Sequence, residues 1–467
     1  MNSSPSPYPK YTSSAVAGLG DIPSHWEERR AKFYLREVDE RSHSGMEEQL
    51  SVSHLTGVRP RRHRNVTMVA ASYSGHKLCR PGDVVVNTMW AWMAALGVSH
   101  GTGLVSPSYG VYRPRNPQTF DSAYLDRLLR LPAYASEYRV NSTGVTSSRL
   151  RLYADKFLNI TLIHPPLEEQ QAIVKYVRHV ERRVGVAIRA KQRLVSLLDE
   201  QRASVIQRAV TCGVPGGTSS PDYWKSLELR RITSLVTSGS RGWAKYYSDS
   251  GHWFLQSGNI GKRLSLKLDR VQCVTIPNNA EGVRTRVRVG DLLVCITGAM
   301  TGNVGLVRED PEFPSYVNQH VALIRPRPDL VSSGFLGLAL HSHSGQQQFK
   351  MSEYGGTKQG LGLAEVKSTR VPVPPIDVQA QIERYAAQET RRIESAISRA
   401  EREISLLREY QTRLTADVVT GKLDVRAAAA TLPDADPHYP DLTAAYAADE
   451  DGLNADLDGD DLPEESM

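Results

Sequence analysis

The chain of 467 residues is 40% hydrophobic and 23% charged, which is long enough and apolar enough for more than one folded domain. Its net charge of +6 conceals a split, because residues 427–467 hold twelve acidic side chains and no Lys or Arg, which leaves +18 on residues 1–426 and favours a polyanion partner. The four cysteines form no Cys-x-x-Cys pair and the most apolar run, residues 89–98, is too short to cross a bilayer, so a disulfide framework, a zinc ribbon and a membrane protein are all disfavoured and a cytoplasmic location is expected.

Residues 1–19 begin with a Ser- and Pro-rich stretch that lacks the apolar segment of a signal peptide, so we expect a flexible leader. Residues 20–163 follow as a first globular region. Within it the turn Gly82–Asp83 precedes the β-branched run Val84–Val86, a pattern typical of a strand that leaves a tight turn. A mixed α and β domain is predicted here.

A long helix is predicted over residues 164–214. The segment opens on two prolines, contains no further proline until the pattern ends, and is rich in residues that favour helix. The same stretch recurs 209 residues later without a gap, so that Pro165 superposes on Pro374 and Gln170 on Gln379. A register held over that length indicates an internal duplication, and its period is too long for a solenoid repeat.

Residues 222–372 form a second globular region that shares anchors with the first. The turn Gly290–Asp291 corresponds to Gly82–Asp83, and Trp224 corresponds to Trp26. The spacing between anchors drifts, so we expect a shared frame with different loops.

The second long helix is predicted within residues 373–426, and both copies carry an apolar stripe with alternating steps of three and four residues, the spacing of a coiled-coil seam. The stripe of the first copy is Val184, Ile188, Lys191, Val195, Leu198, Arg202, Val205 and Ala209; that of the second is Ile393, Ile397, Ala400, Ile404, Leu407, Gln411, Leu414 and Val418. The two helices are therefore predicted to pack on each other. The fold class is α+β, with two mixed domains, two long helices and an internal pseudo-two-fold repeat.

Several polar segments have the side chains that contact nucleic acid: guanidinium and ammonium groups for phosphate or guanine, and hydroxyls, amides and exposed backbone amides in glycine-containing loops. A solvated surface loop explains the densest basic cluster, residues 59–64, equally well, and a plain glycine turn explains residues 141–144 or 355–360. The candidate DNA-contacting residues are Arg59, Arg61, Arg62, Arg64, Lys77, Ser142, Thr143, Arg149, Arg241, Lys245, Thr357, Lys358 and Gln359.

The sequence lacks the motifs of nucleic-acid enzymes. Gly261–Lys262 has no P-loop around it, no glycine-rich turn opens a dinucleotide-binding unit, and neither Pro-Pro dipeptide has the flanking residues of an adenine methyltransferase motif. His341 and His343 have no third ligand at metal spacing, and we interpret them as polar side chains on the surface. No catalytic residue and no metal site is assigned.

The acidic end, residues 427–467, is predicted to be a disordered tail because it is rich in Asp, Ala and Pro. Residues 454–465 nearly match a calcium-binding loop, with Asn454 first and Glu465 last, but no amphipathic helices flank them. The tail interpretation is favoured over calcium binding.

Four motifs together resemble the specificity subunit of Type I restriction-modification systems. They are the Pro-x-x-Trp of residues 23–26, the Pro-Pro-Leu-Glu-Glu-Gln-Gln-Ala-Ile of residues 165–173, its diverged copy at 374–382, and the Thr-Gly-Lys-Leu-Asp-Val-Arg of residues 420–426. The resemblance covers nearly all of residues 20–426. The copy departs from the pattern at Asp377–Val378, and the acidic tail lies outside it.

The resemblance implies a non-catalytic reader of DNA. Residues 20–163 and 222–372 would be target-recognition domains, each reading half of a split, asymmetric site, while residues 164–214 and 373–426 would be the central and distal helical regions, paired antiparallel to set the gap. The apolar residues assigned to this scaffold are Leu167, Ile173, Ile188, Leu198, Ile376, Ile382, Ile397 and Leu407. The implied partners are double-stranded DNA, methyltransferase subunits and restriction subunits. Those partners would use S-adenosylmethionine, ATP and Mg, and no cofactor is expected on this chain.

Two other interpretations stay open at this point. One is a structural coiled-coil protein that binds DNA without reading its sequence, although such a protein needs no pair of diverged domains with matched layout. The other is the specificity subunit of a related phage-defence system.

Overall fold

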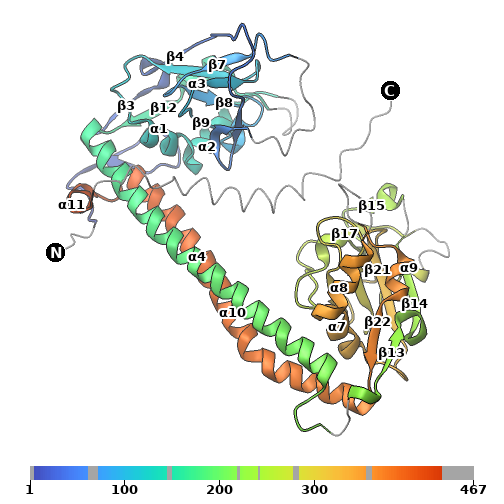
Figure 1. Ribbon diagram of the computed structural model, residues 1–467. Helices are drawn as coiled ribbons and strands as arrows, with labels where there is room; N and C mark the ends of the chain where they lie inside the picture. The colour runs from blue at the N-terminus through green and yellow to red at the C-terminus, as the bar shows by residue number, and fades with distance from the viewer. Residues whose placement is uncertain are drawn as a thin grey trace. The chain divides into compact units, whose positions relative to one another are not determined.

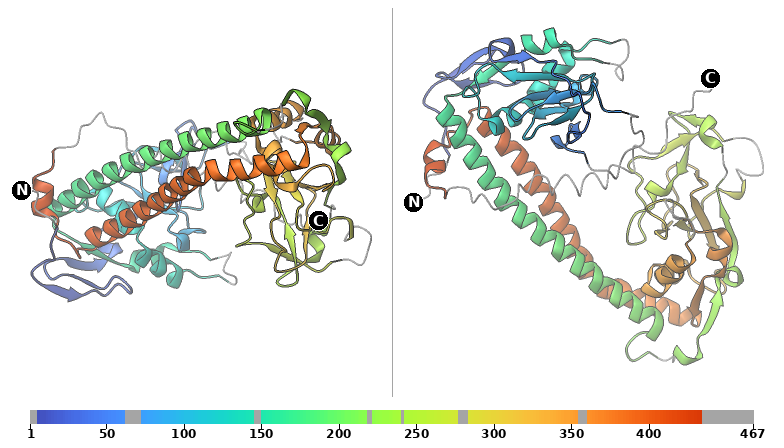
Figure 2. Two further views of the ribbon diagram at one scale, coloured as in Figure 1. Left: turned by 90° about the horizontal axis from the view of Figure 1, so that it is seen from below. Right: turned by 45° about the horizontal axis from the view of Figure 1, so that its top comes forward.

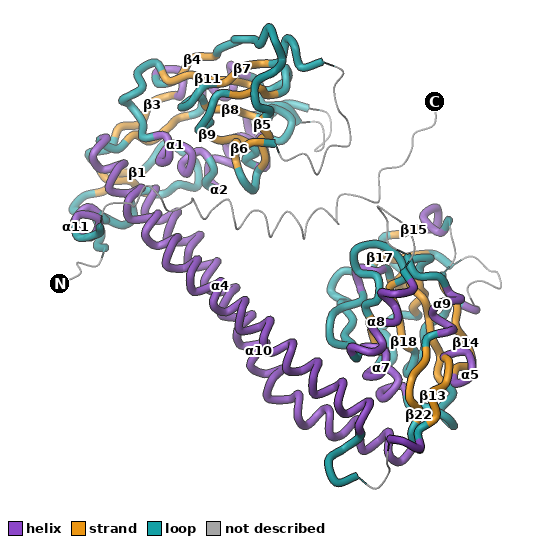
Figure 3. Tube along the Cα trace, viewed as in Figure 1, coloured by secondary structure: helices purple, strands orange, loops and turns teal. Residues whose placement is uncertain are grey.

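A computed structural model describes residues 5–61, 72–144, 150–217, 221–239, 242–276, 283–353 and 360–433 (Figure 1). The chain divides into two compact units. Unit 1 comprises residues 1–190 and 404–467, and unit 2 comprises residues 191–403. Each unit holds one globular region and a part of both long helices, and the strands lie in the globular regions (Figure 3).

The two long helices are α4 (Leu167–Cys212) and α10 (Ile376–Val419). With 46 and 44 residues, they run for roughly 69 and 66 Å at 1.5 Å per residue. Both begin directly after the Pro-Pro dipeptides. The views of Figures 1 and 2 show the two helices side by side.

The predicted stripe is the buried face of the helix pair. All sixteen of its positions are buried or half-buried, whereas the flanking Leu194, Leu197 and Leu406 are 46, 46 and 62% exposed. In unit 2, Lys191 pairs with Glu403, and Arg202 Nε lies 3.1 Å from the Glu394 carboxylate. From Lys191 to Arg202 the chain advances along α4, while their partners go back along α10 from Glu403 to Glu394. The two helices are therefore antiparallel, and the predicted pairing is confirmed.

Each long helix ends on a glycine beneath a tryptophan. In unit 1, Gly421 (φ +76°) follows α10, and an added Cβ there would lie 2.7 Å from the Trp26 ring. In unit 2, Gly213 (φ +77°) follows α4, and an added Cβ would lie 3.3 Å from Trp224. Glycine ends helices in this left-handed conformation because it has no Cβ to clash. The Trp anchors noted in the sequence are therefore helix-end contacts.

The core of unit 1 lies on an antiparallel sheet of order β4-β11-β8-β9, formed by Leu35–Glu37, Gly110–Pro114, Val84–Val86 and Leu96–Val98. Smaller pairs are β1 (Tyr11–Ser13) with β2 (Asp21–Pro23), β3 (Glu27–Arg30) with β12 (Thr161–His164), β5 (Leu50–Ser53) with β6 (Gly57–Pro60), and β7 (Lys77–Cys79) with β10 (Gly103–Val105). The helices are α1 (Ser122–Leu129), α2 (Pro132–Asn141), α3 (Ala154–Asn159) and α11 (Arg426–Ala430), with short 3-10 turns at Ala31–Phe33 and Ala91–Met93. Helix α1 packs on β9.

Unit 2 repeats that sheet in the order β14-β21-β18-β19, formed by Thr233–Ser238, Val321–Pro326, Leu292–Cys295 and Val304–Leu306. The β3–β12 pair of unit 1 is repeated by β13 (Lys225–Glu228) and β22 (Arg370–Val373). A second sheet has the order β15-β17-β16-β20, formed by Tyr247–Ser248, Gln272–Val274, His252–Leu255 and Ser315–Val317. The helices are α5 (Leu229–Ile232), α7 (Ser333–His341), α8 (His343–Ser352) and α9 (Leu363–Ser368), with 3-10 turns at Pro221–Tyr223, Trp243–Tyr246 and Ser257–Asn259. Helix α7 packs on β19, as α1 packs on β9. The α+β fold class and its internal repeat are confirmed.

A buried glutamine joins the globular region to the long helix in each unit. Gln170 Oε1 accepts from the amide of Asp121, which caps α1, while its Nε2 donates to the carbonyls of Thr119 and Pro165. Gln379 makes the three equivalent bonds in unit 2, to Ser332 at the cap of α7 and to the carbonyls of Leu330 and Pro374. A fully buried amide with all these partners satisfied is a rigid junction.

The Gly-Asp turns are also repeated in detail. Gly82 and Gly290 both have φ +88°, a conformation that favours glycine. The buried Asp83 accepts 2.8 Å bonds from Nε and Nη2 of Arg113, which lies on β11. Asp291 holds Arg325 of β21 in the same way, at 2.8 and 2.7 Å. These pairs lock the third strand of each sheet to its neighbour.

The expectation of a flexible leader over residues 1–19 is wrong for residues 5–19. Tyr8, Val16 and Leu19 are 3–4% exposed and belong to the core of unit 1. Ser6 exchanges two backbone hydrogen bonds with Asp424, which lies after α10. The segment is held because the end of the chain supplies a partner for it, and the sequence pattern carried no sign of that pairing.

The prediction of a disordered tail over residues 427–467 is wrong for residues 427–430. Helix α11 reaches Ala430, and Ala428 and Ala429 are buried against unit 1. Residues 434–467, which include the calcium-like motif, lie outside the described residues. No helix within the described ranges is long and apolar enough to cross a membrane.

Candidate nucleic-acid interface

A pair of loops marks the same end of the main sheet in both units. In unit 1 the loop of residues 87–95, between β8 and β9, lies beside the segment that follows α2: the amide of Leu152 donates to the Thr88 carbonyl at 3.0 Å. Within that segment, Thr143 and Arg151 exchange two backbone bonds of 2.9 Å. We call these residues, 87–95 with 142–144 and 150–152, loop pair 1.

Unit 2 has the same arrangement. The amide of Leu361 donates to the Ile296 carbonyl at 2.8 Å, and Thr297 is bridged to Gly360. Loop pair 2 is therefore residues 296–303, between β18 and β19, with residues 360–361. Leu152 and Leu361 are 209 positions apart, as are Thr88 and Thr297, so the duplication extends to the loops.

Both loop pairs lie at the end of the sheet away from the long helices. Strand β8 starts at the Gly82 turn, where an added Cβ would lie 4.0 Å from Ser122 in the first turn of α1, close to the Gln170 junction. Strand β18 starts after the Gly290 turn, where an added Cβ would lie 3.0 Å from Ser333 in the first turn of α7. The strands run away from those junctions, and rigid sheets commonly present binding loops at such free ends.

Loop pair 1 combines aromatic and basic side chains. Met89 and Trp90 are 40 and 50% exposed, and the rings of Trp90 and Trp92 stack with centroids 6.1 Å apart. Arg151 is exposed, with a guanidinium nitrogen 3.7 Å from the Met89 sulfur. Aromatic faces and guanidinium groups are suited to base and backbone contact.

Loop pair 2 is polar instead. The Thr297 hydroxyl lies 2.5 Å from His320 Nδ1, and the Gln319 amide lies 3.0 Å from His320 Nε2. Thr301 donates to the Gly298 carbonyl within the tip of the loop. Such side chains hydrogen-bond to base edges. The two loop pairs thus share a frame and differ in chemistry.

The predicted DNA-contacting residues are spread over several surfaces. Ser142 and Thr143 lie in loop pair 1. Arg59 and Arg61 lie at the β5–β6 hairpin, where the Arg61 guanidinium is 3.4 Å from Gln49. The residues Arg62, Arg64, Arg149, Arg241, Thr357, Lys358 and Gln359 lie outside the described ranges.

Two predicted lysines differ sharply in exposure. Lys245 is exposed in the Trp243–Tyr246 turn, with its ammonium 5.0 Å from the Tyr246 ring centre. Lys77 is 8% exposed, and its ammonium is 3.8 Å from Asp39. Lys77 is therefore poorly placed for phosphate contact.

The predicted scaffold residues mainly face inward. Ile173 and Ile382 are fully buried in the cores of units 1 and 2, and Ile188 and Ile397 are 1 and 0% exposed on the helix-pair stripe. Leu167, Leu198 and Leu407 are half-buried, while Ile376 is 47% exposed at the start of α10. These residues build the scaffold itself, whereas its outer surface is formed by other side chains.

Sequence reasoning missed the two tryptophans of loop pair 1. The run from Met89 to Val98 was interpreted only as too short for a membrane span. Exposed tryptophans directly after a three-residue valine strand were the available signal, because strand ends are where binding loops project. Arg151 was not among the predicted DNA-contacting residues.

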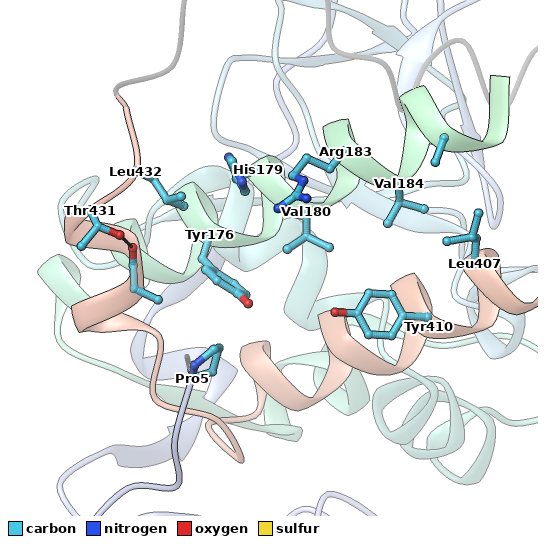
Figure 4. Close-up of a pocket in the computed structure, with 12 residues that line it drawn as sticks. Pro5, Tyr176, His179, Val180, Arg183, Val184, Leu407, Tyr410, Thr431 and Leu432 are labelled. Carbon is cyan, nitrogen blue, oxygen red and sulfur yellow. Dashed lines mark hydrogen bonds between the residues drawn. The ribbon is translucent and has the colours of Figure 1, made fainter. Parts of the chain in front are cut away.

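A groove of about 420 Å³ lies on the helix-pair surface of unit 1 (Figure 4). Its apolar floor includes Val180, Val184 and Leu407; Tyr176 and Tyr410 form its walls, and the Arg183 and His179 side chains also line it. Burial raises the pKa of Tyr176. The pKa of His179 is lowered by burial and by the charges of Arg182 and Arg183. Neutral aromatic walls beside a cationic group suit a protein surface with apolar and acidic side chains.

Unit 2 has a related groove of about 590 Å³ lined by Arg391, Arg392 and Arg399. Arg392 is the duplicate of Arg183, and Ala396 that of Ala187, which lines the first groove. The grooves are therefore repeated with the fold.

Two of the four free cysteines, Cys79 and Cys295, are buried. Burial raises the pKa of the Cys295 thiol to about 12, so it stays protonated, and burial also raises the pKa of Cys79. No group of three or more His, Cys, Asp or Glu side chains within the described ranges is arranged to hold a metal ion. His341, interpreted from the sequence as a polar side chain on the surface, is instead a half-buried neighbour of Arg202 in unit 2, 3.1 Å from its guanidinium.

Comparison with known proteins shows similarity to one class of protein. Residues 284–398 match the family model of the Type I restriction modification DNA specificity domain. This region spans most of the main sheet of unit 2, α7, α8, and the first half of α10. The second globular region and the adjoining helix are thus similar to the DNA specificity class of proteins.

Particular relatives agree with that class. The chain is 25% identical over 276 residues to the Type I restriction enzyme EcoBI specificity subunit of Escherichia coli, over 55% of this chain and 57% of the relative. It is 19% identical over 342 residues to the Type I restriction enzyme MjaVIII specificity subunit of Methanocaldococcus jannaschii, over 69% of this chain and 75% of the relative. The match thus spans little more than half of the first relative. The resemblance to Type I specificity subunits stated from the sequence is confirmed.

A solved structure shares the fold. A chain from a study of complex assembly and conformational transition in a type I R-M system superposes with a TM-score of 0.55 at 16% identity, over 85% of this chain and 98% of that chain. At that identity the likeness shows the fold alone.

Proposed function

We propose that this chain is the non-catalytic DNA sequence-specificity subunit of a Type I restriction-modification complex. The observation that carries the proposal is the duplicated loop pair: two sheets of the same order present loops at the same end, tied by backbone bonds from Leu152 to Thr88 and from Leu361 to Ile296, with the two donors 209 positions apart. A duplicated frame with diverged loops is what a reader of two different half-sites requires.

Each loop pair would read one half of a split site. Loop pair 1 offers Trp90, Trp92 and Arg151, whereas loop pair 2 offers Thr297, which contacts His320 beside Gln319 in the turn between β20 and β21. Because base edges are distinguished by the pattern of donors, acceptors and methyl groups, different side chains on the same frame select different bases. The proposed site is therefore asymmetric, and the body charge of residues 1–426 supplies sequence-independent attraction to the phosphates.

The helix pair would serve as the scaffold of the complex. Its grooves, with apolar floors and arginines, suit protein partners, and we propose methyltransferase subunits there, with restriction subunits joining the assembly. We further propose that this chain binds no cofactor itself, and that the partners use S-adenosylmethionine, ATP and Mg. A cytoplasmic location follows from that role.

The test is reconstitution with and without a methyltransferase partner. The purified chain alone is expected to bind duplex DNA and to transfer no methyl group from S-adenosylmethionine, while the mixture methylates a bipartite sequence. Methylation of single, undivided sequences, or methyl transfer by the isolated chain, contradicts the proposal. Binding without any sequence preference favours instead the structural DNA-binding alternative.

A further inference from the structure

Arg263 of unit 2 lies on a loop of the globular region and is clamped by both long helices. Its Nε and Nη2 each lie 2.8 Å from an Asp199 carboxylate oxygen on α4, and its guanidinium is 3.4 Å from Glu401 on α10. These acids raise the pKa of Arg263 further, with the Asp199 hydrogen bond as the largest cause. Two carboxylates on neighbouring helices therefore hold one guanidinium, which is the group best shaped for a two-nitrogen contact.

The loop that carries Arg263 is itself held rigid. Arg263 and Leu264 have φ of +60° and +59°, a left-handed conformation that costs free energy in residues other than glycine. Leu264 is 3% exposed in the core of unit 2, and its carbonyl accepts from the amide of Leu306 on β19. The strain persists because the core and β19 fix the loop on one side and the helices fix it on the other.

This clamp lies far along the helices from the junction at their ends. The globular region is first joined to α10 near Glu383, whose carboxylate accepts from the Phe335 amide at 3.0 Å, and by Gln379. Glu401 is eighteen residues further, or about 27 Å along the helix at 1.5 Å per residue. Between them, Arg202 joins Glu394 of α10 to His341 at the end of α7. A globular region attached to the helices at one point can pivot about that point. Two attachments about 27 Å apart fix the angle between the globular region and the helix pair.

We infer that Arg263, with Asp199 and Glu401, is a positioning element that fixes the tilt of the second globular region on the helix pair and thereby sets which spacer length between half-sites is accepted. The inference rests on the proposed function and goes beyond it by assigning spacer selection to named residues. One base pair advances about 3.4 Å along DNA. If the globular region pivots at its base, a point about 30 Å away, the diameter of a small domain, moves by that distance when the region tilts by only about 6°. A region held at its base alone would therefore accept neighbouring spacers.

The experiment measures spacer selection in the reconstituted complex. Methylation rates are compared on duplexes that keep both half-sites of the wild-type target and have its spacer, one base pair fewer, or one base pair more. Arg263→Gln removes the clamp from the loop, and Asp199→Asn weakens it from the helix. Lys267→Gln is the matched control, because it removes one positive charge from an exposed side chain of the same segment that lies outside the clamp.

Both clamp variants are expected to lose about tenfold or more of the wild-type preference for the native spacer, measured as a ratio of kcat/KM values, while the control stays within about twofold. The half-site sequences are expected to stay unchanged. A general loss of stability would lower the rates on all three spacers and leave their ratio unchanged. Unchanged spacer preference in both variants overturns the inference. So does loss of all methylation with a lowered Tm in both, because the cluster would then be a stability element only. A wild-type complex that methylates no bipartite site would instead overturn the proposed function.

Discussion

Gln170 makes the same three hydrogen bonds in unit 1 that Gln379 makes in unit 2: one accepted from the capping residue of a short helix and two donated to backbone carbonyls. Both side chains are fully buried. The junction between each globular region and its long helix is therefore built twice from one design.

Replacing Gln379 by Ala is expected to destabilise unit 2 by about 2–4 kcal/mol, because the Ser332 amide and two carbonyls lose their buried partner. Gln388→Ala, on the exposed face of the same helix, is the control and should change stability by less than about 0.5 kcal/mol. Hydrogen exchange resolves the two units separately. Equal protection of unit 2 in Q379A and wild type would contradict the junction.

Asp83→Asn is expected to destabilise unit 1 by about 3 kcal/mol or more, since it leaves the Arg113 guanidinium facing a neutral amide in a site where the aspartate is 1% exposed. Asp329→Asn, which removes one partner of the exposed Arg327 pair, is the matched control with little expected effect. Denaturant unfolding checks both. If D329N lost as much stability as D83N, the large effect of D83N could not be attributed to the burial of Asp83.

The stability of unit 2 is expected to fall in mild acid because of His341. Burial, followed by the Arg202 charge, lowers the pKa of its imidazole to about 4. In the unfolded chain the His341 imidazole has a pKa of about 6.5, so it binds a proton at a higher pH than in the folded chain. The contribution of His341 to the free energy of unfolding is therefore complete above pH 6.5. It is lost as pH falls from 6.5 towards 4, by up to about 3 kcal/mol. Melting temperatures at pH 7.5 and 5.0 test this. His341→Gln should lose the extra pH dependence, whereas the exposed His343→Gln should keep it.

Trp90→Ala is expected to weaken binding to the specific DNA site about tenfold, the loss of about 1–2 kcal/mol from one aromatic contact, with no change in Tm because the ring is half exposed. Phe33→Ala, also exposed in unit 1 but outside loop pair 1, is the control. Binding titrations on specific and unrelated duplexes measure both. A loss of affinity that is equal on the two duplexes would mean that Trp90 does not read sequence.

The helix pair is expected to act as the ruler between the half-sites. Seven residues inserted after Ala190 and seven after Glu403 preserve both stripes, lengthen each helix by about 10 Å, and should add up to about three base pairs to the spacer. Two residues at each place rotate the stripes by about 200° and should abolish assembly. Methylome sequencing reports the spacer. An unchanged spacer with full activity in the seven-residue variant rules out the ruler.

The features that recur in both halves of the sequence could be predicted from it, whereas the features that depend on contacts between distant residues could not. The start of both long helices, their buried stripe and the Gly-Asp anchors follow from local pattern, because proline, helical period and left-handed glycine act within a few residues. The Arg263 clamp and the buried environment of His341 depend on side chains more than sixty residues away in the chain, and no local pattern marks them. The pairing of Ser6 with Asp424 spans almost the whole chain and was missed for the same reason.

That last pairing has a consequence for biosynthesis. The core of unit 1 contains Ile22 and Trp26 together with Val418, Val419 and Val425, and the Tyr124 hydroxyl donates to the Val419 carbonyl at 3.1 Å. The domain translated first therefore completes its core only when α10 and Val425 have left the ribosome, whereas unit 2 is contiguous and closes earlier. A nonsense mutation at codon 404 would spare unit 2 and leave the domain translated first without part of its core.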